Sequence, residues 1–518
     1  MNSQTYTDFS GGLNNRANPA AIADNQSPLC YNTDLDEYGK IQKRRGSKFL
    51  FSTAKGSAIT WIEQFRKADG TTKILYTYGA TLNACDVDGT NDSAITGALT
   101  LTDSKNTLFD SAYCTLSNAP IIVGTNDTDN IWYWTGTGNA AVLSTQTYMP
   151  TAAKCVEWLQ DRLIFGNVVD RGSGSRYTNY LTWSANQAPT TWTADAHIFV
   201  GSAADPIVAM VKMQKVLVVL KEHSVWRVYW DLTNSTFIPE IINPKIGCAA
   251  RNSTAVSTNE LFFLSHDGVY KYDGRGTDEE SIVKISDNLE SESWETNWHT
   301  ARKDKANAVY YSPRNQYRIF IAEGSTAEDA DENRTYYAYH PKFDAWTKGG
   351  HEANCSCVIQ DGSRYRLYVG DYDGQINILD YFDAVTDHAY IDNDNGAAIS
   401  SYWYTKDHNM GYPGLDKGWA KLTVIMSTVS TAQTLTVTQF NDYGDYSTVG
   451  ALSMQATGAV LDVFVLDVDR LGGGLTKKAS MPLLGYSDVT RMKFENNNLN
   501  EHFSILGYSI EYDPAESY

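Results

Sequence analysis

A strand–turn–strand unit that recurs along the chain constrains the fold more than any other feature. Its clearest copy is residues 261–274, in which the apolar run Leu261–Leu264 precedes Asp267-Gly268, a second strand and then Asp273-Gly274. A short apolar run is typical of a strand buried on both faces, and Asp-Gly pairs are typical of tight hairpins. We therefore predict a hairpin with a primed turn at Asp267-Gly268 and with Gly268 at positive φ.

Weaker copies of this unit occupy residues 120–136, 161–192, 216–230 and 365–380. Imperfect repeats at intervals of tens of residues are typical of the blades of a β-propeller. The hairpins predict roughly six blades between residues 51 and 395, with a short helix that begins at Asp287 and carries Trp294 and Trp298. An irregular β-sandwich is the alternative arrangement of the same strands.

The two ends of the chain lack this strand–turn–strand repeat. Residues 1–50 indicate an N-terminal arm or docking segment, extended and held by a few apolar anchors. After a polar boundary near residue 395, residues 396–518 contain longer alternating strands, among them 421–426, 434–439, 460–468 and 505–512. Such alternation predicts a C-terminal antiparallel β-sandwich-like domain with one buried face.

Composition supports an all-β chain and excludes several classes of protein. Among 518 residues there are 33 Tyr, 13 Trp and 17 Phe, which favour strands, and 38 Gly, which favour turns. The net charge of −19 argues against a surface that grips nucleic acid, which needs clustered cations. Seven scattered cysteines do not suggest a disulfide framework. No apolar run reaches membrane length, and no cleaved signal is expected.

Few residues suggest a catalytic or metal-binding site. Two Asp-rich stretches, Asp86–Asp92 and Asp392–Asp394, resemble calcium loops, but no bidentate Glu closes either, so we interpret both as turns. Cys355 and Cys357 lack a second ligand pair, and Lys43–Arg45 is interpreted as a solvated strand edge. We expect no cofactor, no metal and no enzymatic activity, although a spatial pair of carboxylates for glycoside cleavage stays open.

The N-terminal block resembles the start of a known family. It opens with Phe-x-Gly-Gly-Leu-Asn, contains an Asp-Asn stretch and closes with Arg-Arg-Gly, in the residues Phe9, Gly11, Gly12, Leu13, Asn14, Asp24, Asn25, Asn32, Gly39, Lys40, Ile41, Arg44, Arg45 and Gly46. This block is similar to the propeller-bearing tail hub, or nozzle, proteins of short-tailed phages, also called packaged-DNA stabilisation proteins. Residues 246–248 and 411–417 fit the same family.

This resemblance implies a structural virion protein, assembled in the host cytoplasm and located in the virion tail. It implies a ring of identical copies, six in this family, around a DNA ejection channel, with an adaptor and tail fibres as further partners. Carboxylates on the channel wall would let DNA slide rather than bind it. The alternative is a carbohydrate-binding or glycan-cleaving propeller with Trp132 and Trp134 as platforms, unless these side chains fill blade interfaces.

Overall fold

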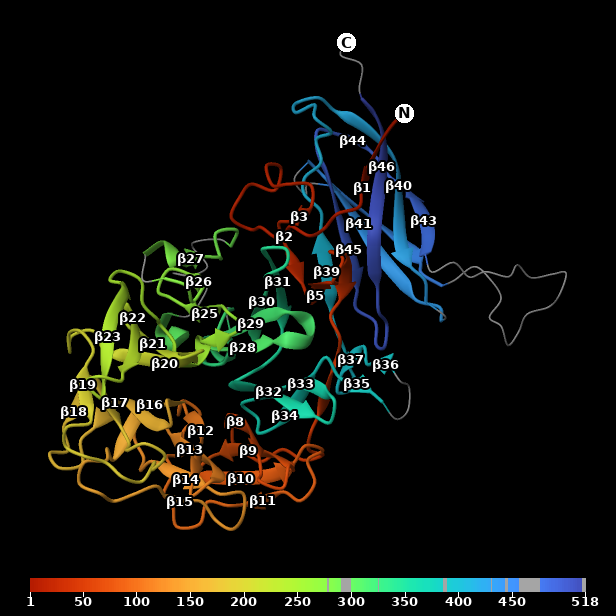
Figure 1. The fold of residues 1–518 in the computed structure, drawn as a ribbon. Coiled ribbons are helices and arrows are strands. Elements are labelled where there is room, and N and C mark those ends of the chain that lie inside the picture. Colours follow the sequence, from red (N-terminus) through yellow and green to blue (C-terminus); the bar gives the residue numbers. More distant parts are fainter. Residues whose placement is uncertain are drawn as a thin grey trace.

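The computed structural model describes residues 1–276, 279–289, 300–324, 326–384, 389–429, 431–442, 446–455 and 476–514. Figure 1 shows a ring of small sheets beside a separate two-layered body that carries both ends of the chain. The ring is a β-propeller, and the two-layered body is a β-sandwich.

Six blades of the propeller are four-stranded antiparallel sheets of consecutive strands. The first blade contains β8 (Ile59–Arg66), β9 (Thr72–Tyr78), β10 (Thr81–Asp86) and β11 (Ser93–Ala94), and the second contains β12 (Asp110–Leu116), β13 (Ala119–Thr125), β14 (Trp132–Trp134) and β15 (Ala141–Val142). The third contains β16 (Ala152–Leu159), β17 (Arg162–Val169), β18 (Arg176–Trp183) and β19 (His197–Phe199), and the fourth contains β20 (Ile207–Met213), β21 (Val216–Lys221), β22 (Val225–Asp231) and β23 (Thr236–Asn243). The fifth contains β24 (Ala255–Val256), β25 (Leu261–Leu264), β26 (Val269–Tyr272) and β27 (Ile282–Lys284), and the sixth contains β28 (Asn307–Tyr311), β29 (Gln316–Ile321), β30 (Thr335–His340) and β31 (Ala345–Gly350).

A seventh blade completes the ring with a strand from the N-terminal block. It consists of β32 (Cys355–Asp361), β33 (Arg364–Gly370) and β34 (Ile376–Leu379), and β34 pairs with β7 (Ser47–Phe49) in the register Leu379↔Ser47. The innermost strand β32 contacts β8 of the first blade, so the ring is closed. The described residues therefore form seven blades, one more than the rough estimate of six, and the outer strand of the seventh comes from outside the region 51–395 predicted for the propeller.

Short strands follow the seventh blade. β37 (Asn393–Asp394) and β38 (Ala397–Ala398) extend its sheet, and β35 (Phe382–Asp383) pairs with β36 (Ala389–Tyr390). Together they lead the chain back toward the sandwich (Figure 1).

The hairpin of residues 261–274 is present, but its turn differs from the prediction. The pairing Leu264↔Val269 leaves a four-residue connection, in which the Ser265 N–H donates to the Gly268 carbonyl over 2.8 Å. Gly268 has φ +153°, as predicted, whereas Asp267 does not have positive φ, so the predicted primed turn is wrong. The Tyr270 hydroxyl donates to Asp267 over 2.8 Å and stabilises the longer loop.

The sandwich draws strands from both ends of the chain. One sheet has the order β43 (Thr476–Pro482), β40 (Lys417–Ser427), β46 (Ser504–Pro514), β6 (Ile41–Lys43) and β5 (Thr33–Leu35), with β1 (Asn2–Tyr6) beside β46 and β44 (Tyr486–Ser487) beside β40. The other has the order β4 (Cys30–Tyr31), β39 (Ser401–Tyr404), β45 (Thr490–Asn496), β41 (Thr434–Asn441) and β42 (Tyr446–Ser453). Leu422, Val424 and Met426 are buried between the sheets, as their alternation indicates.

The N-terminal block is consequently not an arm held only by apolar anchors. Four of its strands, β1, β4, β5 and β6, fill positions in the two sandwich sheets, and β2 (Gly12–Leu13) pairs with β3 (Gln26–Ser27). Joining these sheets satisfies the backbone groups of strands too short to be stable alone. The propeller is thus inserted into the sandwich.

Helices are few in the described part of the chain. The acidic stretch 324–333, expected as a loop, contains α1 (Ala327–Asp331), which begins with a capping box between Thr326 and Asp329. The predicted helix that would carry Trp294 and Trp298 extends beyond the described residues, and the predicted strand 460–468 lies outside them. None of the described helices is long and apolar enough to cross a membrane.

Candidate functional site

The first strand of each blade faces a central channel. Side chains from β8, β12, β20, β28 and β32, together with residues that precede β24, line a cavity of about 180 Å³ in it. Among them are Glu63, Asp110 and Asn307. A propeller channel gathers side chains from every blade and is therefore the natural place to look for a site.

Three carboxylates join neighbouring inner strands around this channel. The Ser111 hydroxyl donates to Glu63 over 3.4 Å, the Val156 N–H donates to Asp110 over 2.9 Å, and the Lys212 N–H donates to Glu157 over 3.1 Å. Each bond links a blade to the next one along the chain. The carboxylates therefore fasten the first four blades to one another.

Burial perturbs all three groups. It raises the pKa of Glu63 and of Asp110, and it raises the pKa of Glu157 to about 7. The charge of Asp110 also raises the pKa of both glutamates. Near neutral pH this part of the wall consequently carries less negative charge than its composition suggests.

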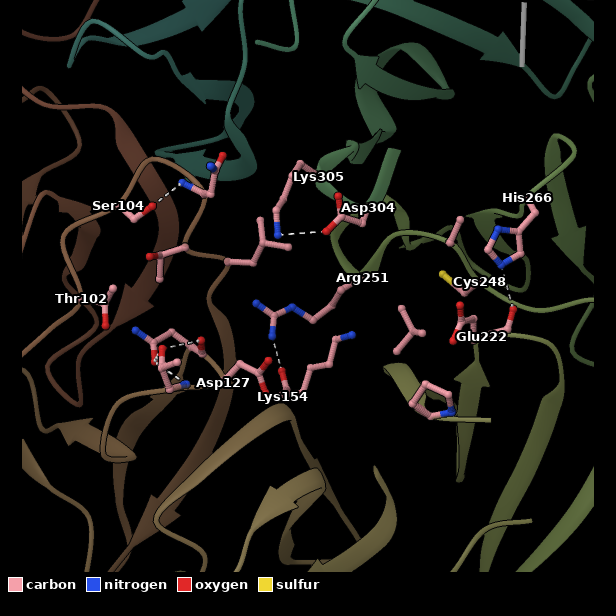
Figure 2. A pocket seen from close by; sticks show the side chains of 18 residues that line it. Thr102, Ser104, Asp127, Lys154, Glu222, Cys248, Arg251, His266, Asp304 and Lys305 are labelled. Atoms are coloured by element: carbon pink, nitrogen blue, oxygen red, sulfur yellow. Dashed lines mark hydrogen bonds and ion pairs between the residues drawn. The ribbon is translucent and has the colours of Figure 1, made fainter. Parts of the chain in front are cut away.

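A larger cavity, here called the mouth cavity, lies at one end of the channel. Figure 2 shows the side chains that line it. Its volume is about 500 Å³, and its walls come from connections between blades, from the second-to-third strand connections of the second, fourth and fifth blades, and from Lys154 in β16 and Val208 in β20. The polar wall contains Thr102, Ser104, Asn106, Asn126 and Thr128, and the charged groups include Lys154 and Arg251. Arg251 lines both the mouth cavity and the channel, so it stands between them.

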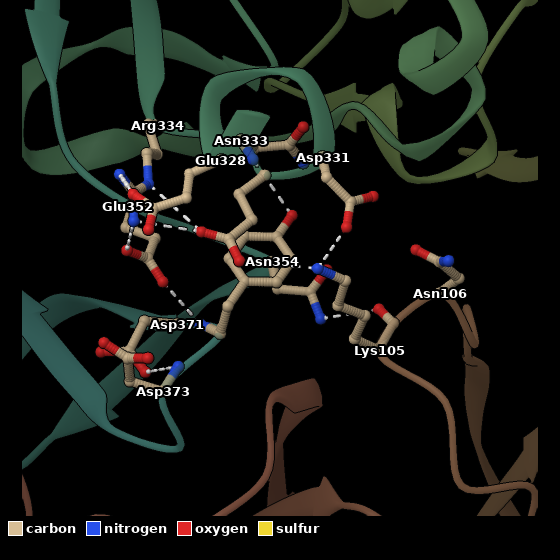
Figure 3. Close-up of polar contacts among 12 residues, drawn as sticks. Lys105, Asn106, Glu328, Asp331, Asn333, Arg334, Glu352, Asn354, Asp371 and Asp373 are labelled. Atoms are coloured by element: carbon tan, nitrogen blue, oxygen red, sulfur yellow. Dashed lines mark hydrogen bonds and ion pairs between the residues drawn. The ribbon is translucent and has the colours of Figure 1, made fainter. Parts of the chain in front are cut away.

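A second polar cluster lies on the same face, where the sixth and seventh blades meet (Figure 3). Arg334 forms ion pairs with Glu328 at 2.7 Å and with Glu332 at 3.2 Å, and Lys105 pairs with Asp331. Burial raises the pKa of Glu352 to about 7, and the nearby charges of Asp371, Glu332 and Asp373 add to this effect. The described contacts are among protein groups, so the cluster ties blades together.

The residues that carry the sequence resemblance gather at the joint between propeller and sandwich. Phe9 and Leu13 are buried, and the Phe9 ring lies 6.3 Å from that of Trp403 in the sandwich. Gly11 and Gly12 precede Leu13, and Asn14 donates to Gln26 over 2.9 Å beside the small pair β2–β3. β2 also packs against β31 of the sixth blade.

Arg44 is the charged centre of this joint. Its guanidinium donates to Asp394 over 3.0 Å and to the Asn32 side chain over 2.8 Å. The Asn32 amide in turn accepts from Gly350 N–H over 2.8 Å and donates to the Ser400 carbonyl over 2.7 Å. Burial acts to raise the pKa of Asp394, but Arg44 lowers it below its usual value.

The neighbours of Arg44 are held in the same way. Arg45 pairs with Asp392 at 3.1 Å, and a Cβ atom on Gly46 would overlap the Asn393 carbonyl oxygen. Lys43 is buried and donates to Asn496 over 2.9 Å. The interpretation of Lys43–Arg45 as a solvated strand edge is therefore wrong, because burial and specific partners hold these cations.

The remaining predicted motif residues lie elsewhere. Asp267 and Gly268 are in the β25–β26 connection, on the face of the mouth cavity. Asp273 and Gly274 are at the opposite end of the hairpin, where Gly274 has φ +72° and Asp273 accepts from Arg275 N–H over 2.9 Å. These four residues shape turns of the fifth blade and do not join the Arg44 cluster.

The Asp-rich stretches have protein partners. Asp86 pairs with Lys73 at 2.6 Å, and Asp92 pairs with Lys55 at 2.5 Å. Asp392 and Asp394 bind the arginines of the joint. Within the described residues no group of three or more His, Cys, Asp or Glu side chains could hold a metal ion.

The tryptophans considered as glycan platforms are inside the protein. Trp132 and Trp134 are 1% and 4% exposed, and the Trp132 ring lies 5.7 Å from that of Trp61 in the first blade. They fill the interface between the first two blades. Their use as platforms for a sugar is therefore excluded.

Sequence reasoning missed the residues of the channel and its mouth. Glu63, Asp110 and Glu157 could have been found, because each is an isolated carboxylate in an apolar strand and they follow one another at equal intervals of 47 residues. Lys154 and Arg251 offer no comparable signal. Lys154 is a single cation in β16 and Arg251 begins a 3-10 helix before β24, and only the closed ring brings the two together.

No protein-family model and no curated protein matches the sequence. Among solved structures, the chain is similar to an extracellular domain from B. thetaiotaomicron, with TM-score 0.42 and 11% identity over 80% of this chain and 46% of that one. It is also similar to the Dos1 propeller, with TM-score 0.38 and 13% identity over 68% and 93% of the two chains. The WD40 domain of Neurospora crassa Pan2 gives TM-score 0.30 and 7% identity over 68% and 88%.

The chain thus spans less than half the length of the first of these structures. Likenesses at such identities concern the fold alone. The propeller follows from the sheet topology, and these structures assign no activity to this chain.

Proposed function

We propose that this chain is a structural subunit of the tail hub, or nozzle, of a short-tailed phage. In this proposal identical copies form a ring, most simply of six, whose channel retains packaged DNA and passes it during ejection. The observation that carries the proposal is the place of the resemblance residues. Phe9–Asn14 and Arg44–Gly46 lie at the joint that fixes the propeller to the sandwich.

A rigid joint suits a ring subunit for a geometric reason. A closed ring forms only when each copy presents two contact surfaces at a fixed relative rotation. If those surfaces lie on the propeller and on the sandwich, the angle between the two bodies sets the rotation. The Arg44–Asp394 pair and the Asn32 bonds restrict that angle, because breaking a buried pair by removing one partner costs about 3–5 kcal/mol.

The charge of the chain agrees with this role. A net charge of −19 favours repulsion between the ring wall and DNA phosphates, so that DNA slides instead of binding. The proposal places the protein in the virion tail after assembly in the host cytoplasm, next to an adaptor and tail fibres. The glycan-binding alternative loses support because Trp132 and Trp134 are buried.

The test combines particle mass, images and DNA binding. We expect mass photometry and negative-stain microscopy of the purified chain, with its tail partners, to show closed rings. We expect no measurable affinity for duplex DNA at low salt. Tight DNA binding that weakens steeply with salt, or a location on the capsid shell, would contradict the proposal.

A joint variant with a matched control sharpens this test. Arg44→Ala should reduce ring formation, since it removes the partner of Asp394. Lys215→Ala, which changes an exposed cation of the propeller, should leave rings intact. Equal ring formation by both variants would show that the joint does not set the ring geometry.

A further inference from the structure

Arg251 in the mouth cavity lacks the partners that a buried guanidinium needs. Its side chain is 5% exposed and lies at the start of a short 3-10 helix, Arg251–Ser253. One terminal nitrogen donates to the Lys154 carbonyl, and Nε donates weakly to Asn252 over 3.4 Å. The second terminal nitrogen, Nη2, has no hydrogen-bond partner among the described residues.

No described carboxylate neutralises this cation. Burial raises the pKa of Asp110 and the Arg251 charge opposes this shift, but the Asp110 oxygens accept N–H bonds from Val156 and Ser111. No ion pair joins Arg251 to Asp110 or to another described side chain. A buried charge is costly unless it is paired, so the site as it stands is incomplete.

A second cation borders the same space. Lys154 lines the mouth cavity and forms no ion pair in the part of the chain that the structure describes, and its carbonyl holds Arg251. Figure 2 shows the two side chains next to each other in the cavity. Two of the wall carboxylates are occupied, since Asp127 binds Arg176 at 2.6 Å and Asp304 binds Lys305 at 3.0 Å. Glu222 supplies the remaining negative charge of the wall.

The rest of the wall suits a polar ligand. Thr102, Ser104, Asn126 and Thr128 offer hydroxyl and amide groups, and His266 is the one aromatic side chain among the described residues of the lining. The volume of about 500 Å³ falls within the usual range for small-molecule sites, about 300–1,000 Å³. The cavity therefore has room for one small polar molecule.

We propose that the mouth cavity binds a small polar molecule through a carboxylate or phosphate group held by Arg251 and Lys154. The free Arg251 nitrogen and the Lys154 ammonium donate to the oxyanion, and the hydroxyl-bearing wall contacts the rest of the molecule. None of the joint residues lines this cavity, so the inferred binding site goes beyond the proposed structural function.

The test measures binding to the full chain by calorimetry and by thermal shift. The probes are inorganic phosphate and D-glucuronate, with D-glucose as the neutral comparison and sodium chloride to match ionic strength. We expect saturable heat and a saturable rise in Tm with at least one oxyanion and none with D-glucose. The probe that binds identifies phosphate or carboxylate as the preferred group.

Variants assign the binding to the two cations. Arg251→Gln should weaken binding about tenfold or more, because bonds between charged groups and donors of this kind contribute about 1.5–3 kcal/mol. Lys154→Gln should weaken it less, and Lys215→Gln, an exposed cation at the β20–β21 turn, should leave it unchanged. The three substitutions remove one positive charge each, so a general salt effect would act on them equally.

Stability of the free protein separates a binding role from a structural one. Arg251→Gln removes an unpaired buried charge, which is stabilising, and a hydrogen bond to the Lys154 carbonyl, which is destabilising, so the free variant should have a Tm close to that of the free wild type. If that variant does not fold, the weaker binding expected of Lys154→Gln tests the proposal instead. Absence of saturable binding by both oxyanions, or unchanged binding in the variants that fold, would overturn the proposal.

Discussion

At the scale of single residues, the close surroundings of Gly268 and Glu157 in the propeller determine how each should respond to substitution. Gly268 combines φ +153° with a close neighbour, since a Cβ atom there would lie 2.5 Å from Ser286 Oγ. Glu157 combines a half-buried carboxylate with two backbone N–H donors at the channel wall. Each of these two positions leads to a testable prediction about the stability of the protein.

Gly268→Val should destabilise the protein by about 1–3 kcal/mol, because a β-branched residue resists positive φ and would crowd Ser286. The measurement is the free energy of unfolding in denaturant. Gly70→Val is the matched control, since Gly70 has φ +87° but nothing within 4 Å of a Cβ atom. An effect no larger than that of the control would mean that the fifth-blade loop does not crowd this position.

Glu157→Gln should stabilise the protein at high pH only. The folded pKa of about 7 exceeds the unfolded value of 4.5, so the folded state binds more protons between these values and wild-type stability falls as pH rises through this window. Glutamine cannot ionise, so we expect a gain of about 1–3 kcal/mol at pH 8 and little change at pH 4.5.

Chemical denaturation at the two pH values measures this difference. Glu280→Gln serves as the control, because Glu280 is exposed. A gain of the same size at both pH values would indicate a packing effect in place of ionisation.

At the scale of elements, the closure of the ring depends on β7. This strand has only three residues and comes from before the first blade, yet it supplies the outer strand of the last one. The Leu50 N–H extends the pairing by donating to the Ile376 carbonyl over 2.8 Å. Closure of a propeller by strands from both ends of its chain makes the ring continuous.

Lys48→Pro should weaken this closure, since proline has no N–H to give to the ladder opposite Ile378. We expect a loss of about 1–3 kcal/mol, with faster hydrogen exchange in β34 and β8. Lys48→Ala is the control, because the side chain is exposed and the backbone N–H is kept. Unchanged exchange in the proline variant would show that the seventh blade is stable without β7.

The elements also show what a sequence can reveal about this fold. The hairpins at 120–136, 216–230, 261–274 and 365–380 were predictable, because burial and turn chemistry are local. The partners of β4, β6 and β7 were not, because each is a short strand that pairs with a segment more than 300 residues away. Arg251 and Lys154 were missed for the same reason, since their proximity exists only in the closed ring.

At the scale of the whole molecule, the joint and the channel respond to pH in opposite directions. Burial lowers the pKa of His340 and His351 to about 4 and that of His408 to about 3. These histidines lie at the joint and in the sandwich, where His408 contacts the Tyr508 hydroxyl at 3.0 Å. The carboxylates Glu157 and Glu352 in the propeller have raised pKa values instead.

Acidification should therefore loosen the joint before the propeller. The unfolded pKa of histidine is 6.5, so the unfolded state binds more protons below it and the histidine contribution is lost as pH falls from 6.5 toward 4. Over the same range the raised carboxylates favour the folded propeller. Hydrogen exchange, corrected for intrinsic rates, should rise first in β39 and β45 while β8, β12 and β16 stay protected.

His408→Gln provides the control for this prediction, because it removes one of the groups that must become charged. The variant should lose less protection in β45 between pH 6.5 and 4.5 than the wild type does. An equal loss of protection from hydrogen exchange in the sandwich and in the propeller would contradict the prediction that acid loosens the joint first.

The insertion of the propeller into the sandwich has a consequence for synthesis on the ribosome. The strands β1, β4 and β6 emerge before the propeller, but their partners β39 and β46 emerge only after about 350 or more further residues have been translated. Until then the backbone groups of these early strands that pair with β39 and β46 have no partner, whereas each propeller hairpin can form as it leaves the exit tunnel. The N-terminal segment is therefore made before the propeller but reaches its sandwich partners only after the propeller has been made.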